Sequence, residues 1–445
     1  MLGGTEKRLI ADVDTNVTLS PDGKELAFLR NHGLVVANED GSGERTLAEP
    51  KSPPFHLSNG IAWSPNGRTI TTDAFWGESA AGRMNPVEFP VQGGKEHFLT
   101  DKRWGWLGNL EWLSDGRGLI MNGRESTSWL PQILYLSYAD GETRRITTDT
   151  NEYWGVSLTA DSRTLATVQE KDSFDSWVAP LADVGSAKPI TSGGSSGHPT
   201  WSRDGRIIFT KNGGRGEADI WVIEPDGSNA KQLTANTGLN ALPRVSPDGQ
   251  YIVFRSERAG TAHLWRMDIN GNNPKQLTNS PEDYLWFGTD FTPDSKWVVY
   301  TRRGADGGLW KVPIEGGEPV RLNATKDAYH PAISPNGKML AYSYHDEAKS
   351  GIEVMSLDSS APAKRFDIAE GTIQWTHDSR SFLYIKSEGG VSNLWSQPIS
   401  GEPPKQLTHF NSELIPYFDL SRDGKQLVMS RGTANRDVVL IRDVK

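Results

Sequence analysis

A short polar turn sequence returns along the whole chain, and its spacing governs how the chain is expected to fold. It starts with Ser or Thr, has Asp or Asn third and ends in Gly or Ser, with one copy a residue shorter. The ten copies begin at Ser20, Ser64, Ser114, Thr159, Ser202, Ser246, Thr292, Ser334, Thr376 and Ser421. The Asp or Asn residues of successive copies lie 42 to 49 residues apart. A steady period of about 40–45 residues with turn chemistry at each step is typical of β-propeller blades.

Each period contains four short segments with strand character. An apolar segment precedes the turn, and an alternating segment such as residues 251–254 follows it. A third segment carries a recurrent aromatic residue, as in Leu264-Trp265, and a Pro-Lys-Gln-Leu-Thr segment such as residues 274–278 ends the period. Lys and Pro suit an exposed outer edge of a sheet. With no convincing helical periodicity, the sequence predicts an all-β propeller of about ten four-stranded antiparallel blades.

The sequence leaves two domain organisations open. In the first, residues 1–445 form one array of ten repeats, and the N-terminal strand 4–10 completes the last blade. That blade otherwise has strands at 415–420, 426–430 and 438–441, and no edge strand. In the second, residues 1–148 form a partial first propeller and residues 149–445 a seven-bladed second one, because ten blades exceed the usual four to eight. A start inside a blade of a longer parent protein is a further interpretation.

Composition excludes several function classes. The net charge is −9, so no nucleic-acid partner is expected, since a phosphate backbone calls for a basic surface. The chain has no Cys, which excludes disulfides, thiolate metal sites and Cys nucleophiles. No apolar run approaches the roughly 20 residues that span a bilayer, and the N-terminus has no apolar signal-peptide core. We therefore expect no membrane insertion by this chain.

The repeated turn and the edge segment resemble TolB-type Pro-Asp repeats, relatives of WD repeats, over essentially the whole chain. More narrowly, residues 2–46 and 437–441 are similar to the propeller regions of bacterial, especially acidobacterial, serine/threonine protein kinases. This resemblance implies a periplasmic or extracytoplasmic sensor propeller joined to a membrane span and a cytoplasmic kinase. The sequence has no Gly-rich phosphate loop, His-Arg-Asp catalytic loop or Asp-Phe-Gly. Kinase activity would therefore require an upstream domain, and we expect no enzyme activity from this chain.

Several local motifs suggest chemistry but have simpler explanations. The turn Asp and Asn residues occur once per blade and do not converge, so we assign them to turn structure. Residues 12–16 begin like a calcium loop, but Val17 stands where Gly is needed and Gly23 where the bidentate Glu belongs. Residues 193–197 match Gly-x-Ser-x-Gly, yet they lie in a Gly/Ser linker and not between a strand and a helix. We expect no metal and no cofactor.

The candidate ligand-binding residues lie in the linkers from an edge strand to the next innermost strand. In a propeller these linkers gather at one mouth of the channel, where aromatic side chains supply large contact areas with few rotors. The candidates are Trp104, Trp106, Tyr153, Trp154, His198, Tyr284, Trp286, Tyr329, His330 and Tyr417. Trp104, Trp154 and Trp286 are expected to be the most exposed. The alternative is that these aromatics pack between blades.

Two of these candidates, His198 and His330, each precede a Pro at equivalent places in different repeats. Both imidazoles are therefore candidates to face the channel; the alternative is a hydrogen bond that the repeat encodes in a loop.

The leading functional hypothesis is a non-catalytic propeller that binds a protein, peptide or glycan. It would be the sensor or interaction module of a bacterial serine/threonine kinase, or a TolB-like envelope protein. The alternative is a propeller enzyme (a lyase, a lactonase or a hydrolase-associated domain) with its active site in the central channel. An enzyme would need carboxylates, imidazoles or a metal that converge there. A WD-type intracellular scaffold is a third hypothesis.

Overall fold

The computed structural model describes residues 8–49, 55–76, 83–125, 128, 130–213, 217–235, 237–280, 283–285, 288–303, 307–323, 325, 327–346, 349–358, 361–368 and 371–444. Within these residues the chain forms β-strands and one short 3₁₀ helix, Val184–Ser186. The all-β prediction is confirmed. The chain divides into two compact units: unit 1 comprises Met1–Lys171 with Asn435–Lys445, and unit 2 comprises Asp172–Ala434.

Unit 1 contains three complete four-stranded antiparallel sheets, each with its strands in chain order. The first sheet has β1 (Thr18–Leu19), β2 (Glu25–Arg30), β3 (Gly33–Asn38) and β4 (Arg45–Ala48). The second has β5 (Phe55–Trp63), β6 (Thr69–Trp76), β7 (Arg83–Pro90) and β8 (His97–Phe98). The third has β9 (Trp106–Trp112), β10 (Gly118–Arg124), β11 (Gln132–Ser137) and β12 (Thr143–Arg145). A fourth sheet begins with β13 (Glu152–Leu158). The first strands contact one another in succession, from β1 to β5 to β9 to β13.

Unit 2 contains five sheets whose strands are consecutive in the chain, and a sixth assembled from two distant segments. The first sheet has β16 (Ser196–Trp201), β17 (Ile207–Asn212), β18 (Ala218–Ile223) and β19 (Lys231–Gln232), and the second has β20 (Asn240–Val245), β21 (Tyr251–Ser256), β22 (His263–Asp268) and β23 (Lys275–Gln276). The third sheet has β24 (Asp283–Tyr284), β25 (Asp290–Phe291), β26 (Trp297–Arg302), β27 (Gly308–Pro313) and β28 (Val320–Arg321). The fourth has β29 (Ala328–Ile333), β30 (Met339–His345), β31 (Ser350–Ser356) and β32 (Lys364–Phe366), and the fifth has β33 (Ile373–Trp375), β34 (Ser381–Glu388), β35 (Val391–Pro398) and β36 (Lys405–Gln406).

The sixth sheet of unit 2 closes a ring of blades. Its order is β37 (Leu414–Leu420), β38 (Gln426–Arg442), β14 (Thr164–Pro180) and β15 (Lys188–Pro189). Its innermost strand, β37, contacts β16 of the first blade of unit 2, where the Thr200 hydroxyl donates to Asp419 at 2.8 Å. Six blades, counted over the described residues, thus form a closed ring that joins early and late segments of the chain.

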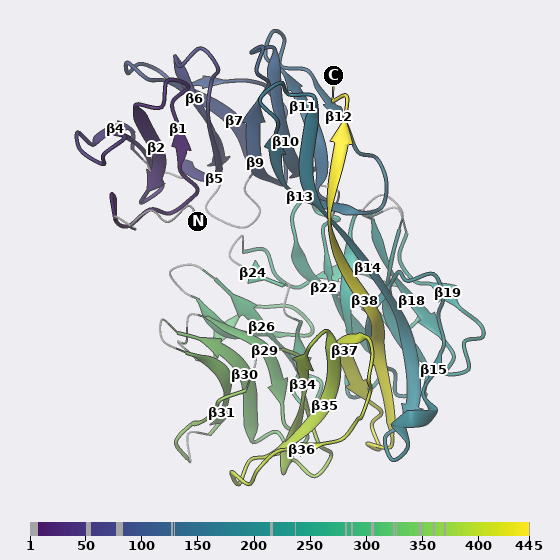
Figure 1. Ribbon diagram of the computed structural model, residues 1–445. Helices are drawn as coiled ribbons and strands as arrows, with labels where there is room; N and C mark the ends of the chain where they lie inside the picture. Colours follow the sequence, from purple (N-terminus) through teal and green to yellow (C-terminus); the bar gives the residue numbers. More distant parts are fainter. Residues whose placement is uncertain are drawn as a thin grey trace. The chain divides into compact units, whose positions relative to one another are not determined.

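The strands β14 and β38 differ from the prediction. Residues 426–430 and 438–441, predicted as two separate strands, lie on one continuous strand, β38. Figure 1 shows β14 and β38 as long neighbouring strands, and each passes from one unit into the other. Their halves in unit 2 complete its sixth blade; their halves in unit 1 extend the sheet of β13, where Arg436 pairs with Glu170 at 2.8 Å.

The N-terminal strand expected at residues 4–10 does not complete the sixth blade of unit 2, because β14 and β15 do. Residues 4–7 lie outside the described residues, and residues 8–10 have no strand structure. Ile10 packs against Phe28, Val35 and Ala37 of the first sheet of unit 1.

The core of each unit lies between neighbouring blades, because alternate side chains of each strand point to opposite faces of its sheet. In unit 2, Val253 and Leu264 of one blade pack against Val298 and Tyr300 of the next. All four side chains are buried. This packing between the middle strands of neighbouring sheets therefore joins one blade to the next.

Candidate functional site

The repeated turns set the position of the channel-lining residues. In one turn, the Ser246 hydroxyl donates to Asp248 at 2.6 Å and accepts the backbone N–H of Tyr251 at 2.9 Å. In another turn, the carboxylate of Asp423 accepts hydrogen bonds from the Ser421 hydroxyl and from the backbone N–H of Lys425. The hydrogen bond from Ser421 lowers the pKa of Asp423. These carboxylates serve their own turns, as the repeated turn sequence predicts.

The side chains two residues before each turn Ser or Thr of unit 2 form a ring around the channel. The six residues at this position, one from each blade, are Thr200, Arg244, Asp290, Ala332, Gln374 and Asp419. All six line one cavity of about 370 Å³. One position of the repeat thus supplies one cation, two acids and two neutral polar groups to a single layer of the channel.

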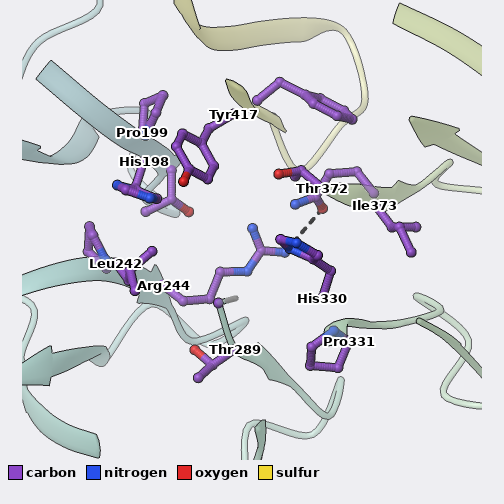
Figure 2. A pocket seen from close by; sticks show the side chains of 15 residues that line it. His198, Pro199, Leu242, Arg244, Thr289, His330, Pro331, Thr372, Ile373 and Tyr417 are labelled. Atoms are coloured by element: carbon purple, nitrogen blue, oxygen red, sulfur yellow. Dashed lines mark hydrogen bonds between the residues drawn. The ribbon is translucent and has the colours of Figure 1, made fainter. Parts of the chain in front are cut away.

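Arg244 connects four blades across this layer. One of its terminal nitrogens donates to Asp419 at 3.0 Å. Its Nε and other terminal nitrogen both donate to Asp290 at 3.2 Å, and the latter also reaches Gln374 at 3.2 Å. Figure 2 shows Arg244 extending across the pocket toward His330. The guanidinium fork therefore ties together strands that are distant in sequence.

The two acids are satisfied from several directions. Asp419 also accepts the Thr200 hydroxyl at 2.8 Å and the backbone N–H of Trp201 at 3.1 Å. Asp290 accepts the backbone N–H of Ile333 at 2.7 Å. Burial raises the pKa of Asp290, against the opposing effect of Arg244. For Arg244, burial alone would lower the pKa, but the charges of Asp419 and Asp290 outweigh it and raise the pKa.

A second, smaller cavity of about 80 Å³ lies on the other side of Arg244, where the linkers enter the innermost strands. His198, His330 and Tyr417 line it, and Figure 2 shows their rings around the same space. The centroids of the His198 and Tyr417 rings are 3.7 Å apart. His198 and His330 both have a φ of 51°, at equivalent irregularities in β16 and β29.

The environment keeps these three groups neutral. Burial, followed by the charge of His330, lowers the pKa of His198 to about 3. Burial lowers the pKa of His330 to about 4. Burial, with the charge of Asp172, raises the pKa of Tyr417 to about 12. Within the described part of the chain, His198 Nδ1 and Thr289 Oγ1 are buried without a hydrogen-bond partner, so both are available to a ligand or water.

The larger cavity opens on the side of the turns, and its rim is chemically divided. Three adjacent blades place His377, Arg422 and Arg203 there, and the other three place Pro335, Pro293 and Pro247. These residues occupy the second position of the repeated turn. His377, Arg422 and Arg203 are all exposed. The mouth is therefore basic on one half and apolar and rigid on the other.

The predicted candidates of unit 2 are only partly brought together. His198, His330 and Tyr417 line the smaller cavity. Tyr329 is buried, and its hydroxyl donates to Asp327 at 2.9 Å. Trp286 and the side chain of Tyr284 lie outside the described residues.

The predicted candidates of unit 1 include one clear correction. Trp104, expected to be exposed, is fully buried in the core between two blades. Tyr153 is also buried, and its hydroxyl donates to Asp149 at 2.8 Å. Trp154 is 38% exposed, as expected, and its ring centroid lies 5.3 Å from that of Trp106.

Arg244, Asp290 and Asp419 were not among the sequence candidates. Each is a single charged residue within an apolar strand, and no local motif surrounds it. The signal that would have found them is their shared register: each lies two residues before the turn Ser or Thr of its repeat. Aligning the repeats on the turn, and not on the linker aromatics, places all three in one layer.

The other chemical motifs have structural roles. The Gly-x-Ser-x-Gly match at residues 193–197 leads into β16, and Ser195 pairs with Phe174 of β14. Among the described residues, no group of three or more His, Asp or Glu side chains could hold a metal ion. No helix in the described part of the chain is long and apolar enough to cross a membrane.

Together, the closed ring and its occluded channel define a β-propeller. The family model described as the TolB beta propeller domain matches residues 194–374, within unit 2. This match confirms the resemblance to TolB-type repeats. A search of curated proteins found no match.

Among solved structures, the crystal structure of TolB from Acinetobacter baumannii is 14% identical, with 87% of each chain covered and a TM-score of 0.44. An oligogalacturonate lyase in complex with manganese is 15% identical, with 77% of this chain and 95% of that chain covered and a TM-score of 0.32. The tricorn protease is 12% identical, with 94% and 42% covered and a TM-score of 0.28. Likenesses this weak say nothing about the activity of this chain.

Proposed function

We propose that unit 2 is a non-catalytic binding module that takes an acidic peptide, or an exposed acidic segment of a protein, at the turn-side mouth of its channel. The observation that carries this proposal is the cavity of about 370 Å³ with a basic half-rim and a proline half-rim. Its volume is in the range of sites that hold small ligands or a few residues of a peptide.

The basic half-rim offers cations that are not used in ion pairs within the described residues. The Arg203 guanidinium donates to the backbone carbonyl of Asp248 at 3.1 Å, and that of Arg422 to the carbonyl of Pro247 at 3.4 Å. The nearby carboxylates of Asp204 and Asp423 accept hydrogen bonds from Ser202 and Ser421 of their own turns. The two guanidinium groups therefore keep donors for a carboxylate, which they recognise in bidentate geometry.

The proline half-rim suits the rest of a peptide. Pro247, Pro293 and Pro335 present rigid apolar rings that lose little entropy when they are covered. A peptide whose carboxylate faces Arg203 and Arg422 would lay its aliphatic groups against these rings. The two halves of the mouth thus favour a ligand with an acidic and an apolar side.

The floor of the cavity favours binding over catalysis. Asp290 and Asp419 are held by Arg244 and by backbone N–H donors. A carboxylate whose lone pairs are engaged in this way is a poor general base, whereas a fixed polar floor preorganises a binding site. We therefore assign the acids to support of the channel.

The experiment is a selection of phage-displayed random heptapeptides on the whole protein, followed by fluorescence anisotropy with the selected peptides. We expect enrichment of Asp and Glu, and at least tenfold weaker binding to an Arg203→Ala/Arg422→Ala double variant, because charge-assisted hydrogen bonds contribute about 1.5–3 kcal/mol each. Lys231→Ala, at an exposed edge strand of the same unit, is the control and should bind normally. Unchanged affinity in the double variant, or selection of basic peptides, would contradict the proposal.

For the wider setting, we infer that the chain serves as the sensor or interaction module of a bacterial serine/threonine kinase, or as a TolB-like envelope protein, and acts in the periplasm. The sequence resemblance supports this inference. Fractionation of the native host with an antibody against the chain tests it: a periplasmic signal supports it, and a purely cytoplasmic one contradicts it.

A further inference from the structure

We infer that unit 1 carries a second binding site, a cleft beside Trp106 that binds neutral oligosaccharides. The cleft has a volume of about 520 Å³ and lies entirely within unit 1. Asp14, Asn16, His32, Trp106 and Asn109 are among the residues that line it. The inference is independent of the peptide site proposed for unit 2.

Trp106 forms an aromatic wall of the cleft, and the ring of Trp154 lies against that of Trp106. The ring centroids of Trp106 and Trp154 are 5.3 Å apart, and the ring planes are inclined by 58°. Trp106 is half-buried, and Trp154 is 38% exposed, one of the largest exposed apolar side chains of the described residues. A pyranose ring has an apolar face of C–H groups and a rim of hydroxyls, so it packs on an indole face while its hydroxyls stay free for polar partners.

Two glycines allow this aromatic wall to form. A Cβ at Gly108 would lie 2.4 Å from the Trp106 ring and 2.7 Å from the amide oxygen of Asn122. Only glycine lets the Trp106 ring fold over the strand at this point. Gly155, directly after Trp154, has a φ of 70°, which an L side chain rarely adopts. Its Cβ position is 4.0 Å from the amide oxygen of Asn109. The backbone directly after Trp154 therefore lies near the Asn109 amide, which lines the cleft together with Trp106.

The polar groups of the cleft suit hydroxyls. The amides of Asn16 and Asn109 combine donors and an acceptor, which matches a hydroxyl that both donates and accepts. One Asp14 oxygen accepts the backbone N–H of His32 at 3.0 Å, which orients the carboxylate. The described lining includes Asp14 but no Lys or Arg. A carboxylate without a cation disfavours acidic sugars, so we assign the cleft to neutral ones.

The test is isothermal titration calorimetry, in which the whole protein is titrated with maltotetraose, cellotetraose, xylotetraose and chitotetraose. Tetragalacturonate serves as the acidic comparison. We expect at least one neutral tetramer to bind with a dissociation constant of 1 mM or below, on the order of −4 kcal/mol, and tetragalacturonate to bind at least tenfold more weakly. Absence of binding by all four neutral tetramers at 10 mM, or preference for the acidic one, would overturn the inference.

Variants then locate the site. Trp154→Ala and Asn109→Ala should each lower the affinity for the tightest-binding tetramer at least fivefold. Trp154→Phe should retain more of this affinity than Trp154→Ala, because it keeps an aromatic face. Val438→Ala, which removes part of an exposed apolar side chain elsewhere in unit 1, is the matched control and should bind as the unchanged protein does. Binding that survives both Trp154→Ala and Asn109→Ala in folded protein would place the sugar elsewhere and refute the inference.

Discussion

Arg244 shows how a single side chain can organise a channel. Its guanidinium pairs with Asp290 and Asp419 and also reaches Gln374, all from other blades. Taken singly, each of these residues is an isolated polar residue in an apolar strand, which is why local sequence patterns did not indicate them. Their convergence depends on ring closure and on a shared register.

Replacing Arg244 tests this role. Arg244→Met should lower the free energy of unfolding by about 3–5 kcal/mol at pH 7, because it leaves the two buried carboxylates without their cation. The check is urea unfolding followed by tryptophan fluorescence. Arg422→Met, on the exposed rim of the same unit, should change the unfolding free energy by no more than about 0.5 kcal/mol. A similar, small effect of both substitutions would show that the network does not stabilise the ring.

The half-buried imidazoles of His198 and His330 predict a pH dependence of stability. In the folded protein the pKa of His198 is lowered to about 3 and that of His330 to about 4, mainly by burial. An unfolded histidine takes up its proton below about pH 6.5. The unfolded state therefore binds more protons between about pH 6.5 and 4, and the free energy of unfolding should fall as the pH drops through this range.

Each histidine should contribute up to about 1.4 kcal/mol per pH unit to this decline. A His198→Gln/His330→Gln double variant should therefore lose stability less steeply between pH 6.5 and 4 than the unchanged protein, as measured by urea unfolding at several pH values. His377→Gln removes an exposed imidazole of the same unit and should leave the decline in place. An equally steep decline in the double variant would show that other groups cause it.

At the scale of elements, most strands and turns follow from local sequence. The turn tetrapeptide, the alternating strand after it and the Lys-containing edge occur where the period predicts them. The exception is the pair β14 and β38, each 17 residues long. Residues 431–437 contain Gly, Asn and Asp, which are typical of turns, yet they lie within β38, because local composition does not distinguish a turn from a point where two backbones approach closely.

Gly432 is such a point of close approach. A Cβ at this position would lie 1.9 Å from the carbonyl oxygen of Ser173 in β14. Gly432→Ala should therefore force β14 and β38 apart and lower the free energy of unfolding by about 1–3 kcal/mol. Gly185→Ala, where the added Cβ meets only an ordinary contact at 3.6 Å, is the control. Equal unfolding midpoints for the two variants in urea would contradict the close pairing.

At the scale of the whole molecule, the period predicted the architecture, but the closure of the ring was not predictable from it. The sixth blade of unit 2 takes two strands from residues 164–189 and two from residues 414–442. Repeat counting assigns each strand to the nearest turn and therefore cannot assign strands to a blade built from distant segments. The aromatic candidate residues lie in two different units. A single ring of ten blades would have placed them all around one channel.

This closure predicts which fragments fold. A chain of residues 172–434 contains all six blades of unit 2 and should show a cooperative thermal transition by far-UV circular dichroism. A chain of residues 194–434 retains the residues matched by the family model but lacks the unit 2 half of β14 and all of β15, so its sixth blade has only two strands. It should melt at least 10 °C lower or fail to fold. Equal melting temperatures would show that closure by β14 and β15 is dispensable.

We propose the turn-side mouth of the unit 2 channel as a recognition site for acidic peptides. Hydrogen–deuterium exchange of the whole protein, with and without a peptide from the phage selection, tests it most directly. We expect slower exchange in the turns around residues 202–206, 246–250 and 421–425, which contribute side chains to the mouth, and little change in the outer strands β19, β23 and β36. Protection confined to the outer strands, with these turns unchanged, would contradict it.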